Sequence, residues 1–285
     1  MLIKSETTPD RSIGAILIDS GKITINDAEQ ILRLQQIENL RFGDAGIKLG
    51  LLSALDIQHA LASQYDYPYL RKGDGAVSEA LVAAYNPHSH HVELLRTLRS
   101  QLMVRHFTGQ LNRKMLTIVS PERGEGRSFL AANLAIVFSQ MGARTLLIDA
   151  DMRHPCQHEL FKLENRQGFS SALAGRDNLQ GVQRVNNFVD LSVLTAGPIP
   201  PNPQELLGRP TLKFLLSNLV EEYDVILIDT PPAANFADAL TLSALAGAAV
   251  VLARKNFSQV ELVSQHKKIM TQSGIEVVGT ILSEF

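Results

Sequence analysis

Several residue types are scarce in this chain of 285 residues, which has one cysteine, no tryptophan and only 6% aromatic residues. The single cysteine, Cys156, excludes an internal disulfide and favours a reducing compartment such as the cytoplasm. No recognisable base arrangement accompanies it, so we interpret it as an ordinary thiol and not as a nucleophile.

The chain also lacks an excess of charge and an apolar run of membrane length. Its formal net charge is −2, so bulk electrostatics indicates no affinity for nucleic acid. The uncharged stretch from Ala239 to Ala253 is shorter than the roughly 20 residues of a membrane-spanning helix. The polar segment from Met1 to Arg11 does not have the pattern of a secretory signal. With 45% hydrophobic residues, the sequence predicts a soluble, cytoplasmic globular protein of about two domains.

A glycine-rich segment, Ser120–Ser128, separates an apolar run of strand length from an amphipathic run of helix length. Gly124 and Gly126 allow the backbone to turn its N–H groups inward. Together with the positive end of the following helix, these donors form a cradle for phosphate groups. Ser128 is placed to ligate a magnesium ion through its hydroxyl. On this segment alone, a tight strand-to-helix turn that binds nothing remains an alternative.

Two positions of this segment depart from the usual phosphate-binding pattern. Arg127 stands where lysine is normal, and Pro121 stands where glycine is expected. An arginine keeps the positive charge but replaces a compact ammonium by a planar, bulkier fork. The sequence therefore supports nucleotide binding more strongly than fast catalysis.

Two further apolar runs end in aspartate. Leu146–Arg153 contains Asp149 and Asp151, and Val225–Pro232 contains Asp229. In a parallel sheet, carboxylates at strand ends line the crevice where phosphates bind. One such aspartate is often only a cap or turn residue, but three of them on two strands beside a glycine-rich loop indicate a bound cation.

From Lys114 onward, apolar runs alternate with helical patterns, which predicts an α/β fold with a mostly parallel sheet and helices on both faces. The expected strands are 115–119, 145–149, 191–194, 225–229, 248–253 and 277–282. The expected helices are 78–85, 91–107, 128–141, 210–222, 237–246 and 259–273, and a rigid proline-rich loop over 197–205 is expected to border the site.

The first part of the chain contains an internal repeat, in which Ser12–Gln35 aligns with Arg41–Gln64. Each copy carries a capping signal, Thr24–Asp27 or Ser53–Asp56, before apolar residues at helical spacing. We predict that each copy forms a short helix, a glycine turn and a longer helix. Residues 1–72 would then form a small all-α domain, with a polar linker beginning near residue 71.

The helix expected over 91–107 carries Glu93, Arg96 and Arg99 roughly along one face. An apolar stripe on the same helix is formed by Leu94, Leu95, Leu98 and Leu102. Helix physics alone indicates a docking helix with a solvated charged face.

Together these segments resemble the bacterial tyrosine kinases of polysaccharide synthesis, which are relatives of partition and septum-site ATPases. The loop and the two aspartate runs fit the wider ATPase superfamily. Pro201–Leu207 and the Glu93/Arg96/Arg99 pattern are more specific to the kinases. In particular, the chain resembles the chain-length-determinant tyrosine kinase of exopolysaccharide synthesis. The resemblance runs from Glu79 to Phe285, so 79–285 is expected to be a P-loop ATPase and tyrosine-kinase-like domain.

The resemblance implies roles for individual residues. Ser128 would hold magnesium directly while Asp149 and Asp229 orient its waters. Asp151 would be the base for a tyrosine hydroxyl, and Arg153 would help to hold the carboxylates, with Arg127 also counted as catalytic. ATP would be bound by Arg123, Gly124, Glu125, Gly126, Arg127, Ser128 and Phe129.

The same resemblance implies partners. Glu93, Arg96 and Arg99 would pack one subunit against the site of its neighbour in a ring. A membrane-spanning adaptor of the chain-length-determinant kind would recruit the protein to the inner face of the cell membrane.

One departure from the kinases, besides Arg127, is the absence of tyrosine after Tyr223, where those kinases carry a tyrosine cluster as their own substrate. Autophosphorylation of such a tail is therefore not expected. The tyrosines at 65, 67 and 69 form the one cluster in the sequence and suggest a packed aromatic segment. Two alternatives stay open: an ATP-dependent assembly switch without tyrosine kinase activity, and, less favoured, a partition-type ATPase.

The N-terminal repeat resembles the N-terminal domain of secretion-type ATPases, a two-motif module that binds cyclic di-GMP. Gly14, Gly21 and Gln35, with Gly43, Gly50 and Gln64 in the second copy, carry the likeness. Ser12 and Gly46 depart from the module's pattern. A plain protein-docking domain is the alternative to a cyclic di-GMP site.

Overall fold

The computed structural model describes residues 12–54, 56–57, 60–61, 70, 73, 75–108, 113–176 and 181–284. The chain divides into two compact units, Met1–Pro68 and Tyr69–Phe285, each described by itself below. The expected boundary at residue 72 and the tyrosines at 65, 67 and 69 lie outside the described residues.

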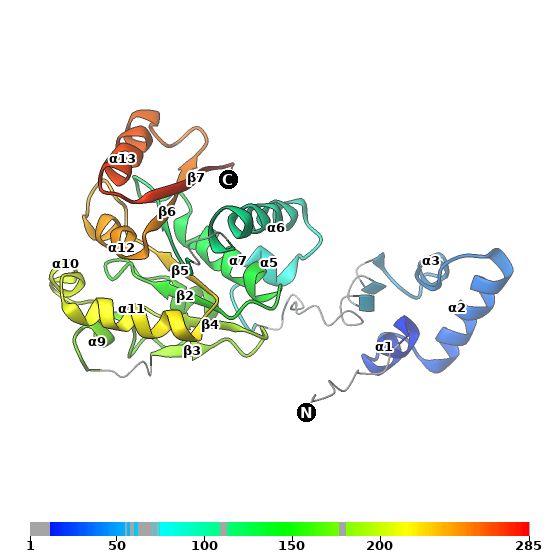
Figure 1. Cartoon of the computed structure of the whole chain (residues 1–285). Coiled ribbons are helices and arrows are strands. Elements are labelled where there is room, and N and C mark those ends of the chain that lie inside the picture. Colours follow the sequence, from blue (N-terminus) through cyan, green and yellow to red (C-terminus); the bar gives the residue numbers. More distant parts are fainter. Residues whose placement is uncertain are drawn as a thin grey trace, which may run out of the picture. The chain divides into compact units, whose positions relative to one another are not determined.

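The larger unit is built on a seven-stranded sheet with the order β3-β4-β2-β5-β1-β6-β7 (Figure 1). All neighbours are parallel except β3, which pairs antiparallel with β4 at one edge. The strands are β1 (Met115–Val119), β2 (Thr145–Asp149), β3 (Val182–Arg184), β4 (Leu191–Leu194), β5 (Val225–Asp229), β6 (Ala248–Arg254) and β7 (Glu276–Ser283). The prediction of a mostly parallel α/β sheet is confirmed.

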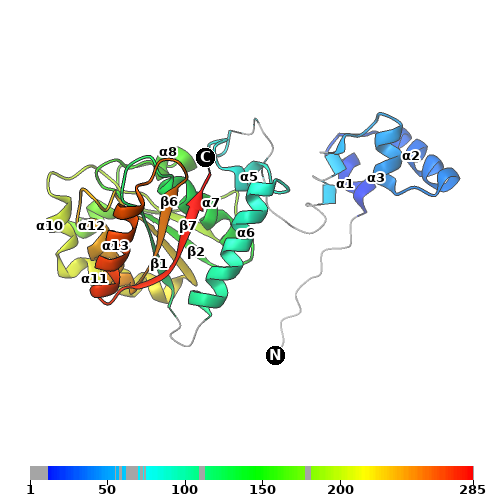
Figure 2. The ribbon, with the colours of Figure 1, turned by 90° about the horizontal axis from the view of Figure 1, so that it is seen from above.

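Helices cover both faces of this sheet (Figures 1 and 2). They are α5 (Val82–Tyr85), α6 (His90–Leu102) with the π-helix η1 (Met103–Phe107), α7 (Arg127–Ser139), α8 (Gln157–Phe161), α9 (Phe169–Leu173), α10 (Pro203–Leu207), α11 (Pro210–Glu222), α12 (Asp238–Ala246) and α13 (Val260–Gln272). Leu147 and Leu227 pack in the cluster with α5, α6 and α7, whereas Ile148 and Ile228 pack with α9 to α12. Because both faces are buried, the central strands read as continuous apolar runs.

Differences from the expected elements concern short or exposed segments. The edge strand β3 and the short helices α8, α9 and α10 were not predicted, because segments of so few residues give no clear periodicity. The expected helix over 91–107 ends its α-helical part at Leu102 and continues as η1. Leu94 is 54% exposed and does not belong to the buried stripe, while Leu95, Leu98 and Leu102 pack against the core.

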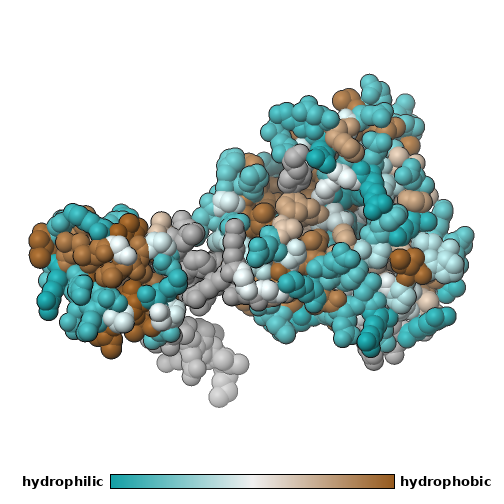
Figure 3. Space-filling view, turned by 180° about the vertical axis from the view of Figure 1, so that it is seen from behind, coloured by the Kyte–Doolittle hydropathy of each residue, from teal (hydrophilic) through white to brown (hydrophobic). Residues whose placement is uncertain are grey.

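In the described part of Met1–Pro68, every regular element is helical. The elements are α1 (Ile13–Asp19), α2 (Ile25–Glu38), α3 (Phe42–Lys48) and a further helical stretch at 54, 56–57 and 60–61. The two copies share their local geometry: Gly21 and Gly50 both have φ +69°, which favours glycine. Figure 3 shows apolar side chains at the surface of this unit, and its exposed large residues include Ile25, Leu32 and Ile37.

The two predicted capping signals are also present. The Thr24 hydroxyl accepts from the Asp27 N–H at 3.2 Å, and the Asp27 carboxylate accepts from the Thr24 N–H at 2.8 Å. Ser53 and Asp56 make the same reciprocal pair at 3.2 and 3.0 Å. In neither unit does the described part of the chain contain a helix long and apolar enough to cross a membrane.

Candidate active site

The parallel register brings the predicted site residues to one edge of the sheet. Asp149 at the end of β2 is the direct partner of Asp229 at the end of β5. Strand β1 lies on the other side of β5, and its end leads through the loop Ser120–Gly126 into α7. The glycine-rich loop and the strand-end carboxylates therefore lie at the same edge of the sheet.

The loop keeps its shape through contacts of its own and with the β6–α13 connection. Gly124 and Gly126 have φ +87° and +96°, in the left-handed region that favours glycine. The Glu125 carboxylate is fully buried, accepts from the Glu122 N–H at 2.7 Å and accepts from the Ser258 hydroxyl. The Arg254 guanidinium donates to the Gly124 carbonyl at 3.0 Å. A curved backbone of this kind suits an anion, although one of its N–H groups is already bonded to Glu125.

The remaining residues predicted to bind ATP flank this curve. Arg123 is exposed at the tip of the loop, and Ser128 and Phe129 are half-buried in the first turn of α7. Arg127, in contrast, is only 6% exposed and its guanidinium donates to protein acceptors. These acceptors are the Thr230 carbonyl at 2.9 Å, the Glu122 carbonyl at 2.6 Å and the Ser120 hydroxyl.

Burial lowers the pKa of Arg127, and the charges of Asp229 and Asp151 oppose that shift. The Arg127 guanidinium thus lies beside Asp229 and Asp151 and is hydrogen-bonded to Ser120 and Glu122 of the glycine-rich loop.

Asp149 is fully buried and held by backbone donors. Its Oδ2 accepts from the N–H groups of Cys156 and Gln157 at 3.1 and 3.0 Å, and its Oδ1 accepts from the Asp151 N–H at 3.3 Å. Burial and the nearby charge of Asp229 raise the pKa of Asp149 well above its usual range. This carboxylate is therefore held in place at an electrostatic cost that a nearby cation would offset.

Asp229 is likewise fully buried, and burial raises its pKa to about 6 although the Ser128 hydroxyl and the Gln157 amide oppose the shift. Its Oδ2 accepts from Gln157 Nε2 at 2.8 Å. Gln157 was not predicted, because nothing in its sequence neighbourhood distinguishes it. It reaches the site because α8 begins after the loop that follows β2 and lies against α7, which brings Gln157 to the Asp149 and Asp229 carboxylates.

Asp151 and Arg153 follow β2, and the structure separates their side chains. Asp151 Oδ1 accepts from the N–H groups of Arg153 and His154 at 3.1 and 2.9 Å, which fixes the direction of the carboxylate. The Arg153 guanidinium instead pairs with the buried Asp238 at 3.0 and 3.3 Å and lies over the Phe236 ring. It joins the loops after β2 and β5, and none of its side-chain bonds reaches the three predicted acids. Asp238 was not predicted as part of the site. The one feature that marks it is an acidic residue at the start of a helix, α12.

Cys156 lies half-buried next to these acids. Burial and the charge of Asp229 raise the pKa of its thiol to about 12, so the thiolate is disfavoured at neutral pH. This agrees with the interpretation of Cys156 as an ordinary thiol.

The strand ends fit a hydrated magnesium ion. Asp229 Oδ1 and Gln157 Oε1 are buried acceptors without a hydrogen-bond partner among the described residues. Within those residues, no group of three or more His, Cys, Asp or Glu side chains is arranged to hold a metal ion. The ion would thus be held by the Ser128 hydroxyl, by phosphate oxygens and by waters bonded to Asp149 and Asp229.

The predicted interface residues lie on α6. Glu93 pairs with Arg96 one turn later, and the Glu93 side chain is 60% exposed. The Arg99 guanidinium donates to the Val137 carbonyl of α7 at 2.8 Å, so this residue also contributes to packing within the unit.

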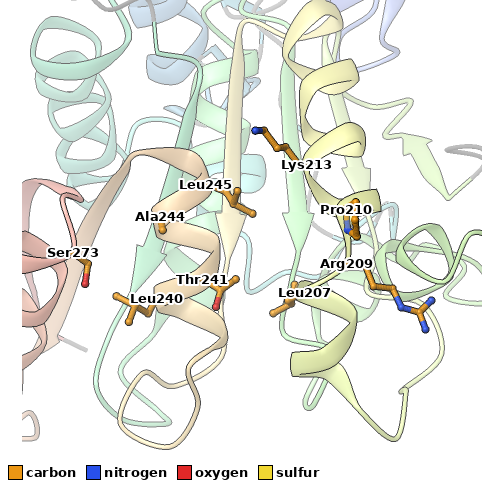
Figure 4. Close-up of a pocket in the computed structure, with 10 residues that line it drawn as sticks. Leu207, Arg209, Pro210, Lys213, Leu240, Thr241, Ala244, Leu245 and Ser273 are labelled. Carbon is orange, nitrogen blue, oxygen red and sulfur yellow. The ribbon is translucent and has the colours of Figure 1, made fainter.

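A cavity of about 600 Å³ lies elsewhere, where Leu207 and Lys213 face Leu240 and Leu245 across the gap between α10–α11 and α12 (Figure 4). Its lining includes neither the glycine-rich loop nor any of the strand-end acids. We assign no part of the active site to it.

Comparisons with known proteins agree with this geometry. Residues 113–272 match the model of a family described as an AAA domain. The tyrosine-protein kinase YwqD of Bacillus subtilis (strain 168) is 36% identical over 215 residues, which cover 75% of this chain and 90% of YwqD. The putative tyrosine-protein kinase CapB of Staphylococcus aureus is 33% identical, covering 70% of this chain and 86% of CapB.

Solved structures give the same result. The chimerical protein CapA2B2 has a TM-score of 0.68 at 33% identity, covering 80% of this chain and 98% of that one. The kinase domain of Escherichia coli tyrosine kinase ETK also has a TM-score of 0.68, at 32% identity, covering 72% of this chain and 79% of that one. With its aspartates and glycine-rich loop at one edge of the same fold, the chain belongs to the bacterial tyrosine-protein kinases, within the wider AAA domain family.

Proposed function

We propose that the protein is a magnesium- and ATP-dependent protein-tyrosine kinase that controls exopolysaccharide chain length and export. The observation that carries the proposal is the direct pairing of Asp149 with Asp229 beside the loop that ends at Ser128. Inward N–H groups and the start of α7 hold the phosphates, and Ser128 faces the metal. When bound, magnesium neutralises charge on the transferred phosphoryl group.

Within this proposal, Asp151 accepts the proton of the attacking tyrosine hydroxyl. Its carboxylate is only 6% exposed and is oriented by the N–H groups of Arg153 and His154. Arg153 holds the β2 and β5 loops together through Asp238, so its role is to position Asp151 and not to touch the phosphates.

The test is transfer of radiolabelled phosphate from ATP to tyrosine in candidate partner proteins. Asp151→Asn keeps the shape of the side chain and removes the base, so phosphotyrosine should fall by about 100-fold or more. Asp224→Asn, which removes an exposed pair with Arg144 at the opposite ends of β5 and β2, is the matched control. Loss of label in the control but not in Asp151→Asn would contradict the assignment.

A second candidate is an ATP-dependent assembly switch without tyrosine kinase activity. It is favoured by the three protein acceptors that hold Arg127, since a guanidinium bonded to the loop is not free to follow a moving phosphoryl group. The switch predicts ATP-dependent oligomerisation in sedimentation experiments with no phosphotyrosine on any partner.

We also propose that the protein assembles as a ring on a membrane-spanning adaptor at the inner face of the membrane, with Glu93, Arg96 and Arg99 at the contact between subunits. The exposed Glu93 carboxylate supports this role for α6. Glu93→Lys should reduce ATP-dependent oligomers in sedimentation. An unchanged oligomer distribution would move the contact elsewhere.

For the N-terminal repeat we propose a cyclic di-GMP site, supported by the shared turn geometry of Gly21 and Gly50. Calorimetric titration of the full chain tests it. Absence of heat at high micromolar ligand would leave the repeat as a protein-docking unit, a role that its exposed Ile25, Leu32 and Ile37 also suit.

A further inference from the structure

The Gln157 side chain donates hydrogen bonds to both the β5 aspartate and the start of α7. Gln157 is the first residue of α8 and is fully buried. Its Nε2 donates to Asp229 Oδ2 at 2.8 Å and to the Ser128 carbonyl at 3.0 Å, while its backbone N–H donates to Asp149 Oδ2 at 3.0 Å. Three parts of the site, β2, β5 and the first turn of α7, are therefore joined through this residue.

The remaining atom of this amide is unpaired. Gln157 Oε1 is buried and has no hydrogen-bond partner in the described part of the chain. The Gln157 amide contacts the Asp229 carboxylate, whose Oδ1 is also buried and without a hydrogen-bond partner among the described residues. A buried acceptor left without a donor destabilises a protein, so two of them on hydrogen-bonded neighbours point to a missing donor.

The chemistry of the surroundings identifies that donor. Both unpaired atoms are oxygens that need a donor, the Gln157 carbonyl always and the Asp229 carboxylate when it is ionised. Asp149, the register partner of Asp229, adds a further carboxylate beside them. A water polarised by a cation donates two hydrogen bonds and reduces the repulsion between the carboxylates, whereas an anion or a carbonyl would do neither.

We propose that Gln157 is a positioning residue for the metal, whose Oε1 accepts a hydrogen bond from a water of the hydrated magnesium ion. The amide would hold Asp229 and the Ser128 turn with its nitrogen and the ion's water with its oxygen. The inference rests on the proposed magnesium–ATP site. It adds that the Gln157 amide contributes to the affinity for the ion.

The test measures ATP affinity in the presence and absence of Mg²⁺, and Mn²⁺ binding by electron paramagnetic resonance, in the full-length protein. Gln157→Met keeps the length of the side chain and removes both polar atoms. It should weaken metal binding by about 10- to 100-fold and reduce the gain in ATP affinity that Mg²⁺ provides. Gln140→Met, at the opposite end of α7, is the matched control and should leave both quantities unchanged.

Gln157→Glu separates the oxygen from the nitrogen, because it keeps an acceptor and loses the donor to Asp229 and Ser128. The added negative charge beside Asp229 attracts a cation, so this variant should bind the metal at least as tightly as wild type. Gln157→Asn draws the amide oxygen back by one methylene; it should weaken metal binding, and it carries the test if Gln157→Met does not fold. Equal losses in Gln157→Met and Gln157→Glu would overturn the proposal, since the nitrogen alone would then explain them. Wild type that binds ATP with Mg²⁺-dependent affinity while Gln157→Met keeps that dependence would also overturn it. Wild type that binds no Mg²⁺–ATP would instead refute the proposed function.

Discussion

The two units of the chain use aspartates in opposite ways. In the N-terminal repeat, a hydrogen bond from Lys22 and one from the Ser53 hydroxyl lower the pKa of Asp56 to about 2, and bonds from Thr24 lower that of Asp27. At the strand ends of the larger unit, burial raises the pKa of Asp149 and Asp229. The first pair stabilises the fold in its charged form. The second pair is held ready for a ligand at the expense of stability, a common feature of functional sites.

The largest effect is expected from Asp229→Asn, which removes one of the two buried carboxylates. We expect Mg²⁺-dependent ATP binding to fall by about 10- to 100-fold, because a group that orients the metal's waters is removed. At pH 7 the unliganded variant should nevertheless unfold at a higher temperature than wild type. Calorimetric titration and a thermal melt measure the two effects. Asp56→Asn, the control, should leave ATP binding unchanged, and a lower melting temperature for Asp229→Asn would refute the contrast.

Arg127→Lys tests the role of the guanidinium that lies beside the buried aspartates. The ammonium cannot form the fork that bonds the Thr230 and Glu122 carbonyls, so it is free to reach a phosphate. We expect phosphoryl transfer to rise on the order of tenfold, with a smaller change in ATP affinity. Single-turnover kinetics with labelled ATP measure the rate of phosphoryl transfer. Arg144→Lys, in the exposed ion pair with Asp224, is the control. A slower variant would show that the arginine itself serves the reaction.

The pH dependence of stability should have opposite signs for the two kinds of aspartate. The folded-state pKa of Asp229 is raised from 3.8 to about 6, so the folded protein binds more protons and stability falls as pH rises from about 4 to above 6. The loss is on the order of 1–3 kcal/mol. Urea denaturation of the unliganded protein between pH 4.5 and 7.5 measures it. Asp229→Asn should flatten the curve, and an unchanged slope would assign the effect to other groups.

The smallest expected effect concerns the helix starts of the repeat. Ser53→Ala removes the hydroxyl that accepts from the Asp56 N–H, and should cost about 1 kcal/mol of unfolding free energy. The stability that the Asp56 charge supplies should be lost as pH falls from about 4 toward 2, since its folded pKa is lowered. Exchange of amide hydrogens in 42–61 reports both changes. Equal exchange in wild type and Ser53→Ala would show that this cap does not contribute.

Much of the site could be predicted because it depends on local pattern and on sheet geometry. Apolar runs buried on both faces located β1, β2 and β5, and parallel pairing then required Asp149 and Asp229 to meet. Side-chain partners from distant segments were not predictable. The contacts of Gln157 with Asp229, of Asp238 with Arg153 and of Ser258 with Glu125 join helix starts or a connection to distant segments, and such packing leaves no periodic pattern in the sequence. The exposure of Leu94 was missed for a similar reason, because helical spacing does not fix where a buried stripe ends.

The buried carboxylate of Glu125 has a consequence for how nucleotide arrives. Glycines lose the most conformational freedom when they are fixed, yet here the bend around them is already fastened by Glu125 to Glu122 on one side and to Ser258 on the other. The ordering has been completed during folding, so an incoming triphosphate meets a rigid receptor and little of its binding free energy is spent on shaping it.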